Sequence, residues 1–70
     1  MKYLIVIEKT RAGYSAYSTD IPGCVATGET RSDVEQGIRE AIEFHLEGLK
    51  AEGANLPPPE SYSTYLDVSA

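Results

Sequence analysis

One amphipathic helix dominates the sequence and limits how the rest of the chain can pack. At about 100° per residue, the apolar residues between positions 33 and 52 form one continuous stripe, and charged residues fill the opposite side. The stripe consists of Val34, Ile38, Ala41, Ile42, His45, Leu46 and Leu49. Gly37 and Gly48 lie on one flank of it, where we expect a neighbouring segment to pack closely. Because a single stripe must be buried against another element, and the other apolar segments are short and β-like, the sequence predicts an α+β fold.

The helix carries its own start and stop signals. Ser32 is a favourable N-cap, and Glu35 three residues later completes a capping box. Thr30 with Asp33 offers a competing register for the same cap. Gly53 follows the helix where a glycine C-cap is expected, because glycine tolerates the positive φ of that position.

Three strands are expected before the helix, over residues 2–9, 14–19 and 24–29. The first is rich in β-branched residues, and the second carries aromatic residues and threonine, as strands do. Between the second and third strands, Pro22 fixes φ and lacks an N–H group, while Gly23 can take positive φ. This pair favours a tight turn, and the short connections together predict an antiparallel meander.

A stiff crossing and a short apolar segment follow the helix. Residues 54–61 contain Pro57–Pro59, which favours an extended polyproline path. Residues 63–68 alternate, with Leu66 and Val68 on one side, and predict a last strand at an edge or an interface. The expected architecture is a single domain of order β-β-β-α-β, with a three- to four-stranded antiparallel sheet and one helix on one face.

The first strand is apolar on both sides. Tyr3, Ile5 and Ile7 point one way, and Leu4 and Val6 point the other. One helix covers only one face of a sheet, so the second apolar face stays open unless another molecule covers it. Because large exposed apolar faces usually mark interfaces, the pattern predicts a homo-oligomer, a dimer or a tetramer.

Composition narrows the classes of partner. Six Lys and Arg against eleven Asp and Glu give a net charge of −5, which disfavours non-specific nucleic-acid binding because phosphates attract cations. The longest apolar run, Tyr3–Ile7, is far shorter than the ~20 residues of a membrane helix, so no membrane span is expected. Lone Cys24 cannot close an internal disulfide, which is typical of a reducing cytoplasm. We therefore expect a cytoplasmic domain.

The sequence contains no clear set of catalytic residues. Cys24 and His45 are the only thiol and imidazole, and since no residue stands out that would activate either, we interpret both as packing residues. A structural zinc site needs four ligands, and one Cys and one His are too few to supply them. The glycines also lack the spacing of a phosphate-binding loop. Glu8, Asp20 and Glu29 lie at strand ends or in a turn, rather than converging on two metal ions. No catalytic residue, metal or cofactor is expected.

Acidic residues concentrate on the helix and the segment after it. Ser32–Glu60 contains seven acids and two bases, whereas Met1–Arg31 contains three acids and four bases. Three glutamates form a strip on the exposed side of the helix, which could steer a basic partner; an ordinary solubility face is the alternative. Two tyrosines of the second strand are candidate anchors, because tyrosine is enriched at interfaces. The candidate partner-binding residues are Glu40, Glu43, Glu47, Tyr14 and Tyr17.

The most specific sequence pattern runs from Tyr17 to Thr30. It reads Tyr-Ser-Thr-Asp-Ile-Pro-Gly-Cys-Val-Ala-Thr-Gly-Glu-Thr, a D-x-P-G-C turn between two strands followed by G-x-T before the helix. The acidic helix start and apolar-Ala-Ile run of Asp33–Ile42 follow it, and Pro57–Pro59 come later. Together these features closely resemble the HicB-like antitoxins, over about residues 1–60.

This resemblance implies a partial RNase H-like fold without the nuclease carboxylates. It also implies that the protein neutralises a HicA toxin, a small basic RNA-binding domain that cleaves messenger RNA with a catalytic histidine, and that it forms dimers or tetramers. An acidic antitoxin fits a basic toxin. Longer members carry a C-terminal DNA-binding module, which Ser61–Ala70 is too short to supply, so no direct DNA binding is expected.

Two other functions stay open on the sequence alone. The first is a stand-alone oligomeric module that binds a small ligand or scaffolds an unrelated protein. The second is an enzyme that depends on Cys24; a thiol that titrates at its ordinary pKa of about 8.5 would count against it.

Overall fold

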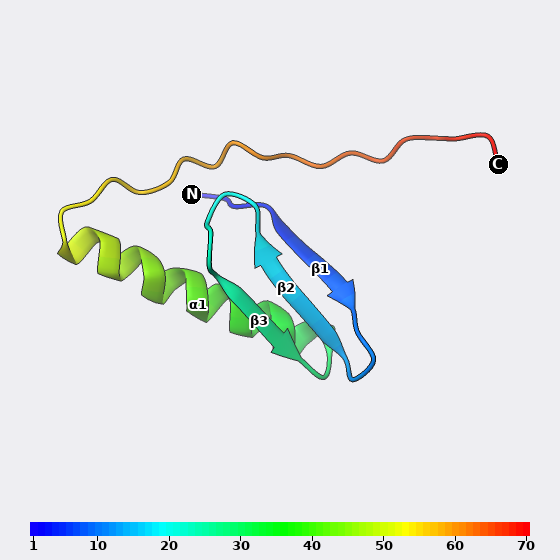
Figure 1. The fold of residues 1–70 in the computed structure, drawn as a ribbon, viewed down its shortest axis with the longest axis horizontal. Helices are drawn as coiled ribbons and strands as arrows, with labels where there is room; N and C mark the ends of the chain where they lie inside the picture. Colours follow the sequence, from blue (N-terminus) through cyan, green and yellow to red (C-terminus); the bar gives the residue numbers. More distant parts are fainter.

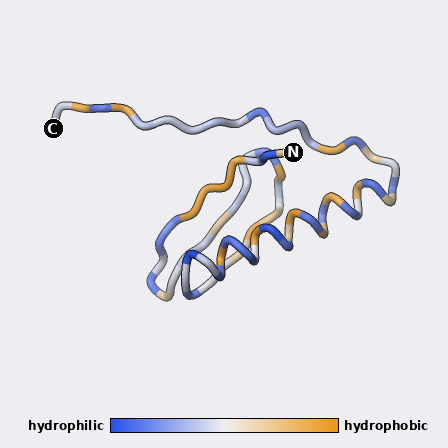
Figure 2. The backbone as a smooth tube through the Cα atoms, turned by 180° about the vertical axis from the view of Figure 1, so that it is seen from behind, coloured by the Kyte–Doolittle hydropathy of each residue, from blue (hydrophilic) through white to orange (hydrophobic).

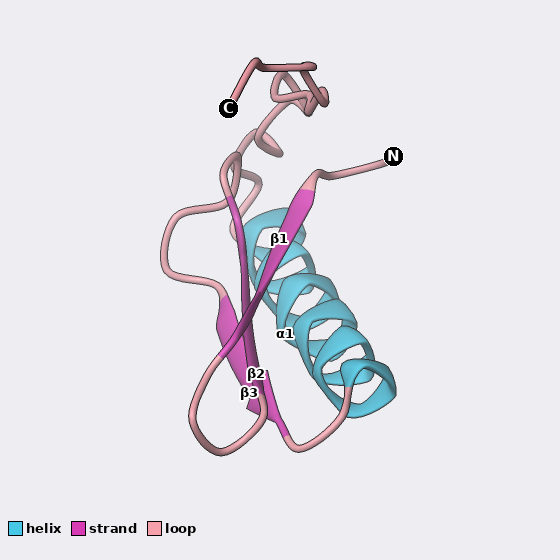
Figure 3. Ribbon diagram, turned by 90° about the vertical axis from the view of Figure 1, so that its right-hand side faces the viewer, coloured by secondary structure: helices cyan, strands magenta, loops and turns pink.

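The computed structural model describes residues 1–70 and contains a three-stranded antiparallel sheet with one helix across it (Figure 1). The strands are β1 (Ile5–Lys9), β2 (Tyr14–Ser18) and β3 (Val25–Gly28), and they lie in the order β1-β2-β3. Helix α1 (Arg31–Ala51) follows β3 and covers one face of the sheet, as the side view in Figure 3 shows. The predicted α+β meander with a single covering helix is confirmed.

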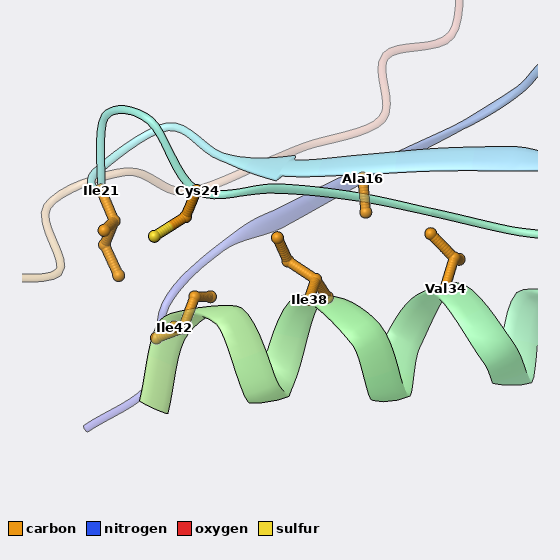
Figure 4. Close-up of a cluster of buried hydrophobic side chains, with 6 residues drawn as sticks. All are labelled: Ala16, Ile21, Cys24, Val34, Ile38 and Ile42. Carbon is orange, nitrogen blue, oxygen red and sulfur yellow. The ribbon is translucent and has the colours of Figure 1, made fainter. Parts of the chain in front are cut away.

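The core lies between α1 and the sheet (Figure 4). Side chains spaced four residues apart along α1 point at the sheet, and the loop between β2 and β3 closes one end of the core. The buried apolar residues are Ala16, Ile21, Cys24, Val34, Ile38 and Ile42. All three helical members belong to the predicted stripe, whose remaining residues are only half-buried because the sheet is narrow.

Small residues set the distance between α1 and the sheet. A Cβ on Gly37 would lie 3.4 Å from the Cβ of Ala26 on β3, which confirms the predicted close packing at this glycine. A Cβ on Gly48 would meet nothing within 4 Å, so the same prediction is wrong there. The helix extends past the end of β3 at Gly48, and nothing packs on that flank.

The helix starts two residues earlier than predicted. The Oγ1 of Thr30 accepts a hydrogen bond from the backbone nitrogen of Asp33 at 3.0 Å, so Thr30 is the N-cap. Ser32 lies inside the first turn, and its assignment as the cap is wrong. The reason is a close approach: a Cβ on Gly28 would lie 2.7 Å from the backbone nitrogen of Val34, so β3 ends directly against the helix start.

The turn and C-cap predictions are confirmed. Gly23, after Pro22 in the β2–β3 loop, has a φ of 85°, and Gly53 after α1 has a φ of 72°. The backbone nitrogen of Gly53 donates to the carbonyl of Lys50, and that of Ala54 donates to the carbonyl of Leu49. These two bonds form a Schellman motif and satisfy carbonyls that the helix end would leave free.

The sheet face opposite α1 is open, as the two-sided apolar pattern of β1 predicts. Tyr17 on β2 lies between Val6 of β1 and Val25 of β3, and these three side chains share the outer face. Tyr17 is 39% exposed and Val25 is 69% exposed.

The predicted strand over 63–68 is not formed in the single chain. Residues 54–70 adopt no helix or strand, and no backbone hydrogen bond joins them to the sheet. They run as an extended tail across one end of the sheet and continue past β1 (Figure 1). The tail is attached at two places, where Tyr3 donates to the carbonyl of Pro57 and where Ser61 donates to Asp20.

Candidate protein-docking site

The acidic strip lies along the outer side of α1. Glu40, Glu43 and Glu47 are three and four residues apart, which places them side by side, and all three are exposed. The one ion pair of the chain lies in the first turn of α1, away from the strip. The three carboxylates therefore form no ion pair within the chain, and Glu40 accepts a hydrogen bond from the Nε2 of Gln36 at 2.9 Å.

An exposed phenylalanine borders this strip. Phe44 is 81% exposed, and it lies four residues after Glu40 and three before Glu47, so both carboxylates flank its ring. Beside it, between α1 and the start of β3, lies an open groove of about 470 Å³. The groove is lined by Gly23, Cys24, Val25, Ala41, Phe44, His45, Gly48, Leu49 and Glu52.

This arrangement is a candidate protein-binding surface. An apolar centre surrounded by polar residues is typical of protein interfaces, and exposed aromatic side chains supply much of the binding energy there. We define the docking face as Glu40, Glu43, Phe44 and Glu47. Its charge fits a basic partner.

Phe44 is the residue that the sequence interpretation missed. A signal was present: Phe44 is the one aromatic residue of α1 and falls outside the apolar stripe, among charged positions. Figure 2 shows this alternation as orange and blue segments along the helix. Because exposed aromatic side chains are enriched at interfaces, its position among charged residues makes Phe44 a candidate contact.

The two candidate tyrosines do not lie together. Tyr14 is half-buried, packs against the core and faces α1, whereas Tyr17 points to the open sheet face. Neither belongs to the docking face on α1. Their roles as anchors stay predictions, and a single partner would have to reach two faces of the sheet to contact both.

Cys24 is a packing residue in this structure. It is buried, and its Sγ lies 3.9 Å from the carbonyl oxygen of Ala41, to which it donates. Burial raises the pKa of the Cys24 thiol, which disfavours the thiolate that a nucleophile requires. His45 is half-buried on the wall of the same groove.

No three His, Cys, Asp or Glu side chains gather closely enough to hold a metal ion. The helix lacks the length of apolar sequence needed to cross a membrane.

Curated proteins with a similar sequence come from a phage, bacteria and archaea. A 14.9 kDa protein from the rep–hol intergenic region of Haemophilus phage HP1 is 37% identical over 67 residues, which are 96% of this chain and 50% of that protein. A UPF0150 protein of Thermoplasma acidophilum is 34% identical over 58 residues, which are 81% of this chain and 84% of that protein. The chain thus spans about half the length of the phage relative.

Two solved structures share the fold. One is a HicA3 and HicB3 toxin–antitoxin complex, with a TM-score of 0.69 and 42% identity over 84% of this chain and 70% of that chain. The other is the antitoxin HicB3, with a TM-score of 0.70 and 42% identity over 81% of this chain and 42% of that chain. The model of the HicB-like antitoxins of bacterial toxin–antitoxin systems matches residues 3–69. Since that match spans nearly the whole chain, this protein belongs to the HicB-like antitoxin family.

Proposed function

We propose that this chain neutralises a HicA-type toxin by binding it through the docking face on α1, without catalysing a reaction. The observation that carries this proposal is the exposed Phe44 within a strip of carboxylates that form no ion pair. Similarity to the HicB3 chain of a toxin–antitoxin complex supports the choice of partner. Because the substrate of such a toxin is messenger RNA, neutralisation would take place in the cytoplasm.

The charges and the ring would contribute at different stages of binding. Carboxylates at the rim attract a basic partner over distances of about a Debye length and raise the association rate, an effect that salt weakens. The Phe44 ring would be buried on contact and would slow dissociation, because large aromatic side chains dominate interface energies.

The toxin is obtained first. The tagged chain is purified from its native host at low salt, and a small basic companion is identified by mass spectrometry. Recovery of the chain alone, as an oligomer, would instead favour the ligand-binding or scaffold alternative.

Variants then test the docking face with the recovered toxin. Replacing Glu40, Glu43 and Glu47 by Gln should lower the association rate by about tenfold at low salt and flatten its salt dependence. The matched control replaces the exposed Glu8, Glu29 and Glu60 by Gln, which removes the same charge elsewhere and should change the rate less. Phe44→Ala should mainly raise the dissociation rate, by about tenfold or more. Unaltered affinity and salt dependence in the α1 variants would rule out this docking face.

A further inference from the structure

The groove beside Phe44 lies where the last turns of α1 project beyond the sheet (Figure 1). Ala41 and Gly48 form its floor, because residues seven apart lie on the same side of a helix. Phe44 borders this floor on the exposed side, and the half-buried His45 and Leu49 border it on the side of the sheet. The groove therefore runs along the helix and has one aromatic wall.

Gly48 leaves space in this groove that no part of the chain fills. A Cβ at this position would meet nothing within 4 Å, so close packing does not require the glycine. A glycine inside a helix costs about 1 kcal/mol relative to alanine. Since Gly48 has no packing role in the single chain, the space above it is available to a ligand that lies along the helix.

Three residues around the groove carry polar groups without a partner in the chain. The side chains of His45 and Glu52 take part in no hydrogen bond or ion pair. The backbone N–H and C=O of Gly23, which lines the groove from the β2–β3 loop, form no hydrogen bond either. Because carbonyl and carboxylate oxygens are acceptors, the groove suits a ligand that donates several hydrogen bonds.

Charge favours a cationic ligand. The groove is lined by one carboxylate, that of Glu52, and by no Lys or Arg. Glu52 is also the C-cap of α1, and the C-terminal end of a helix carries a partial negative charge. Lys50, the nearest cation in the sequence, lines a different groove, between α1 and β1. The end of the groove beside Phe44 is therefore negative, whereas its floor and outer wall are apolar.

We propose that the groove beside Phe44 is an arginine site, which receives one arginine side chain of the toxin. The aliphatic part of that side chain packs over Gly48 and against the Phe44 ring, and its guanidinium group donates to the carboxylate of Glu52. Arginine fits better than lysine, because its planar group offers five donors and is more weakly hydrated than an ammonium group. This inference rests on the proposed function, since the toxin supplies the arginine, and it names the chemical group that is recognised.

A peptide titration of the intact chain tests the site without the toxin. The probes are acetyl-glycyl-arginyl-glycinamide and its citrulline counterpart, which has a similar shape and no charge, and binding is followed by NMR of the backbone amides. The arginine peptide should shift the amides of Gly23, Gly48 and Glu52 and bind about tenfold more tightly than the citrulline peptide. Equal binding of the two peptides, or shifts confined to other parts of the chain, would overturn the proposal.

A matched pair of variants assigns the charge preference to one carboxylate. Glu52→Gln keeps the length of the side chain and should remove the preference for the arginine peptide. Glu60→Gln removes the same charge from the exposed tail and should retain the preference. Equal circular dichroism of the two variants shows that α1 stays folded. A preference that survives Glu52→Gln would overturn the proposal.

A double-mutant cycle with the recovered toxin identifies the arginine. Each arginine of the toxin is replaced by glutamine in turn, and its affinity is measured for the wild type, for Glu52→Gln and for Glu60→Gln. At one arginine the replacement should weaken binding to the wild type and to Glu60→Gln about tenfold, and should have little effect on binding to Glu52→Gln. The absence of such a coupled arginine would overturn the proposal.

The outcomes separate this inference from the proposed function. If Phe44→Ala and the glutamate variants of α1 weaken toxin binding while no arginine is coupled to Glu52, the docking face stands and the arginine site is wrong. If those variants leave toxin binding unaltered, the docking face is wrong, and the assignment of the arginine to the toxin falls with it even where the arginine peptide binds.

Discussion

Ser61 donates two hydrogen bonds to the carboxylate of Asp20, from its backbone nitrogen at 3.1 Å and from its Oγ at 2.9 Å. The two residues are 41 positions apart, and Asp20 is the acidic residue of the D-x-P-G-C pattern. The pattern therefore does more than reverse the chain between β2 and β3. Its aspartate holds the tail across the end of the sheet and sets the direction in which the residues after Ser61 leave it.

We expect Asp20→Ala to release the tail without unfolding the domain. The hydrogen bonds are exposed to solvent, so the free energy of unfolding should fall by only about 1 kcal/mol. Exchange of the Ser61 amide, followed by NMR, should accelerate strongly. Asp67→Ala removes the same charge from a carboxylate with no partner and should leave Ser61 unchanged; equal exchange in both variants would contradict the attachment.

Gly28→Ala should destabilise the domain through the start of α1. The new methyl group would lie 2.7 Å from the backbone nitrogen of Val34, and backbone atoms cannot give way as a flexible side chain can. Overpacking of this kind costs about 1–3 kcal/mol, which urea unfolding would detect. Thr27→Ala, at the exposed neighbouring position, serves as control, and equal stability of the two variants would disprove the close contact.

Local signals predict this fold well where a residue's own chemistry decides its conformation. Gly23 and Gly53 take positive φ as expected, and Val34, Ile38 and Ile42 are the buried part of the helical stripe. Local signals do not decide the start of α1, because two capping registers compete there. The approach of Gly28 to the helix decided between them, and no local pattern contains that contact.

The last segment depends on a relation that sequence spacing does not contain, whereas the placement of the candidate site residues follows from spacing. Residues 63–68 have the alternation of a strand, but a strand also needs a sheet edge within reach, and the attachment of Ser61 at Asp20 directs these residues away from the sheet. The strip formed by Glu40, Glu43 and Glu47 follows from helical periodicity alone. The separation of Tyr14 from Tyr17 follows from period-two alternation, which places strand neighbours three apart on opposite faces.

Ser18→Ala should leave stability unchanged or increase it by up to about 1 kcal/mol. Ser18 is 5% exposed on the inner face of β2, and its Oγ has no hydrogen-bond partner, so the hydroxyl is desolvated without compensation. Ser15→Ala on the other face of β2 is the control for strand propensity. A clear loss of stability in Ser18→Ala alone would mean that the hydroxyl makes a bond in solution.

Burial of Cys24 predicts a stability that decreases at alkaline pH. Because the pKa of the thiol is raised in the folded protein, the unfolded chain loses its proton first as the pH rises. The contribution of the protonated thiol is therefore complete below the unfolded pKa of about 8.5 and diminishes above it. Urea unfolding from about pH 7 to about pH 10 should show a steeper loss in the wild type than in Cys24→Ala, which shares all other titrating groups. Parallel profiles would contradict the shift.

Gly48→Ala and Gly37→Ala form a matched pair that separates helix propensity from packing. Replacing a helical glycine by alanine stabilises a helix by about 1 kcal/mol when the methyl group meets nothing. Gly48 has open space, so its variant should reach that gain; at Gly37 the Cβ of Ala26 is 3.4 Å away, and the gain should be smaller or absent. Thermal and urea unfolding measure both. If Gly48→Ala also weakens toxin binding while Gly37→Ala does not, the groove beside Phe44 takes part in docking, because Gly48 lines this groove. Equal gains in stability at the two positions would mean that α1 does not rest on β3 at Gly37.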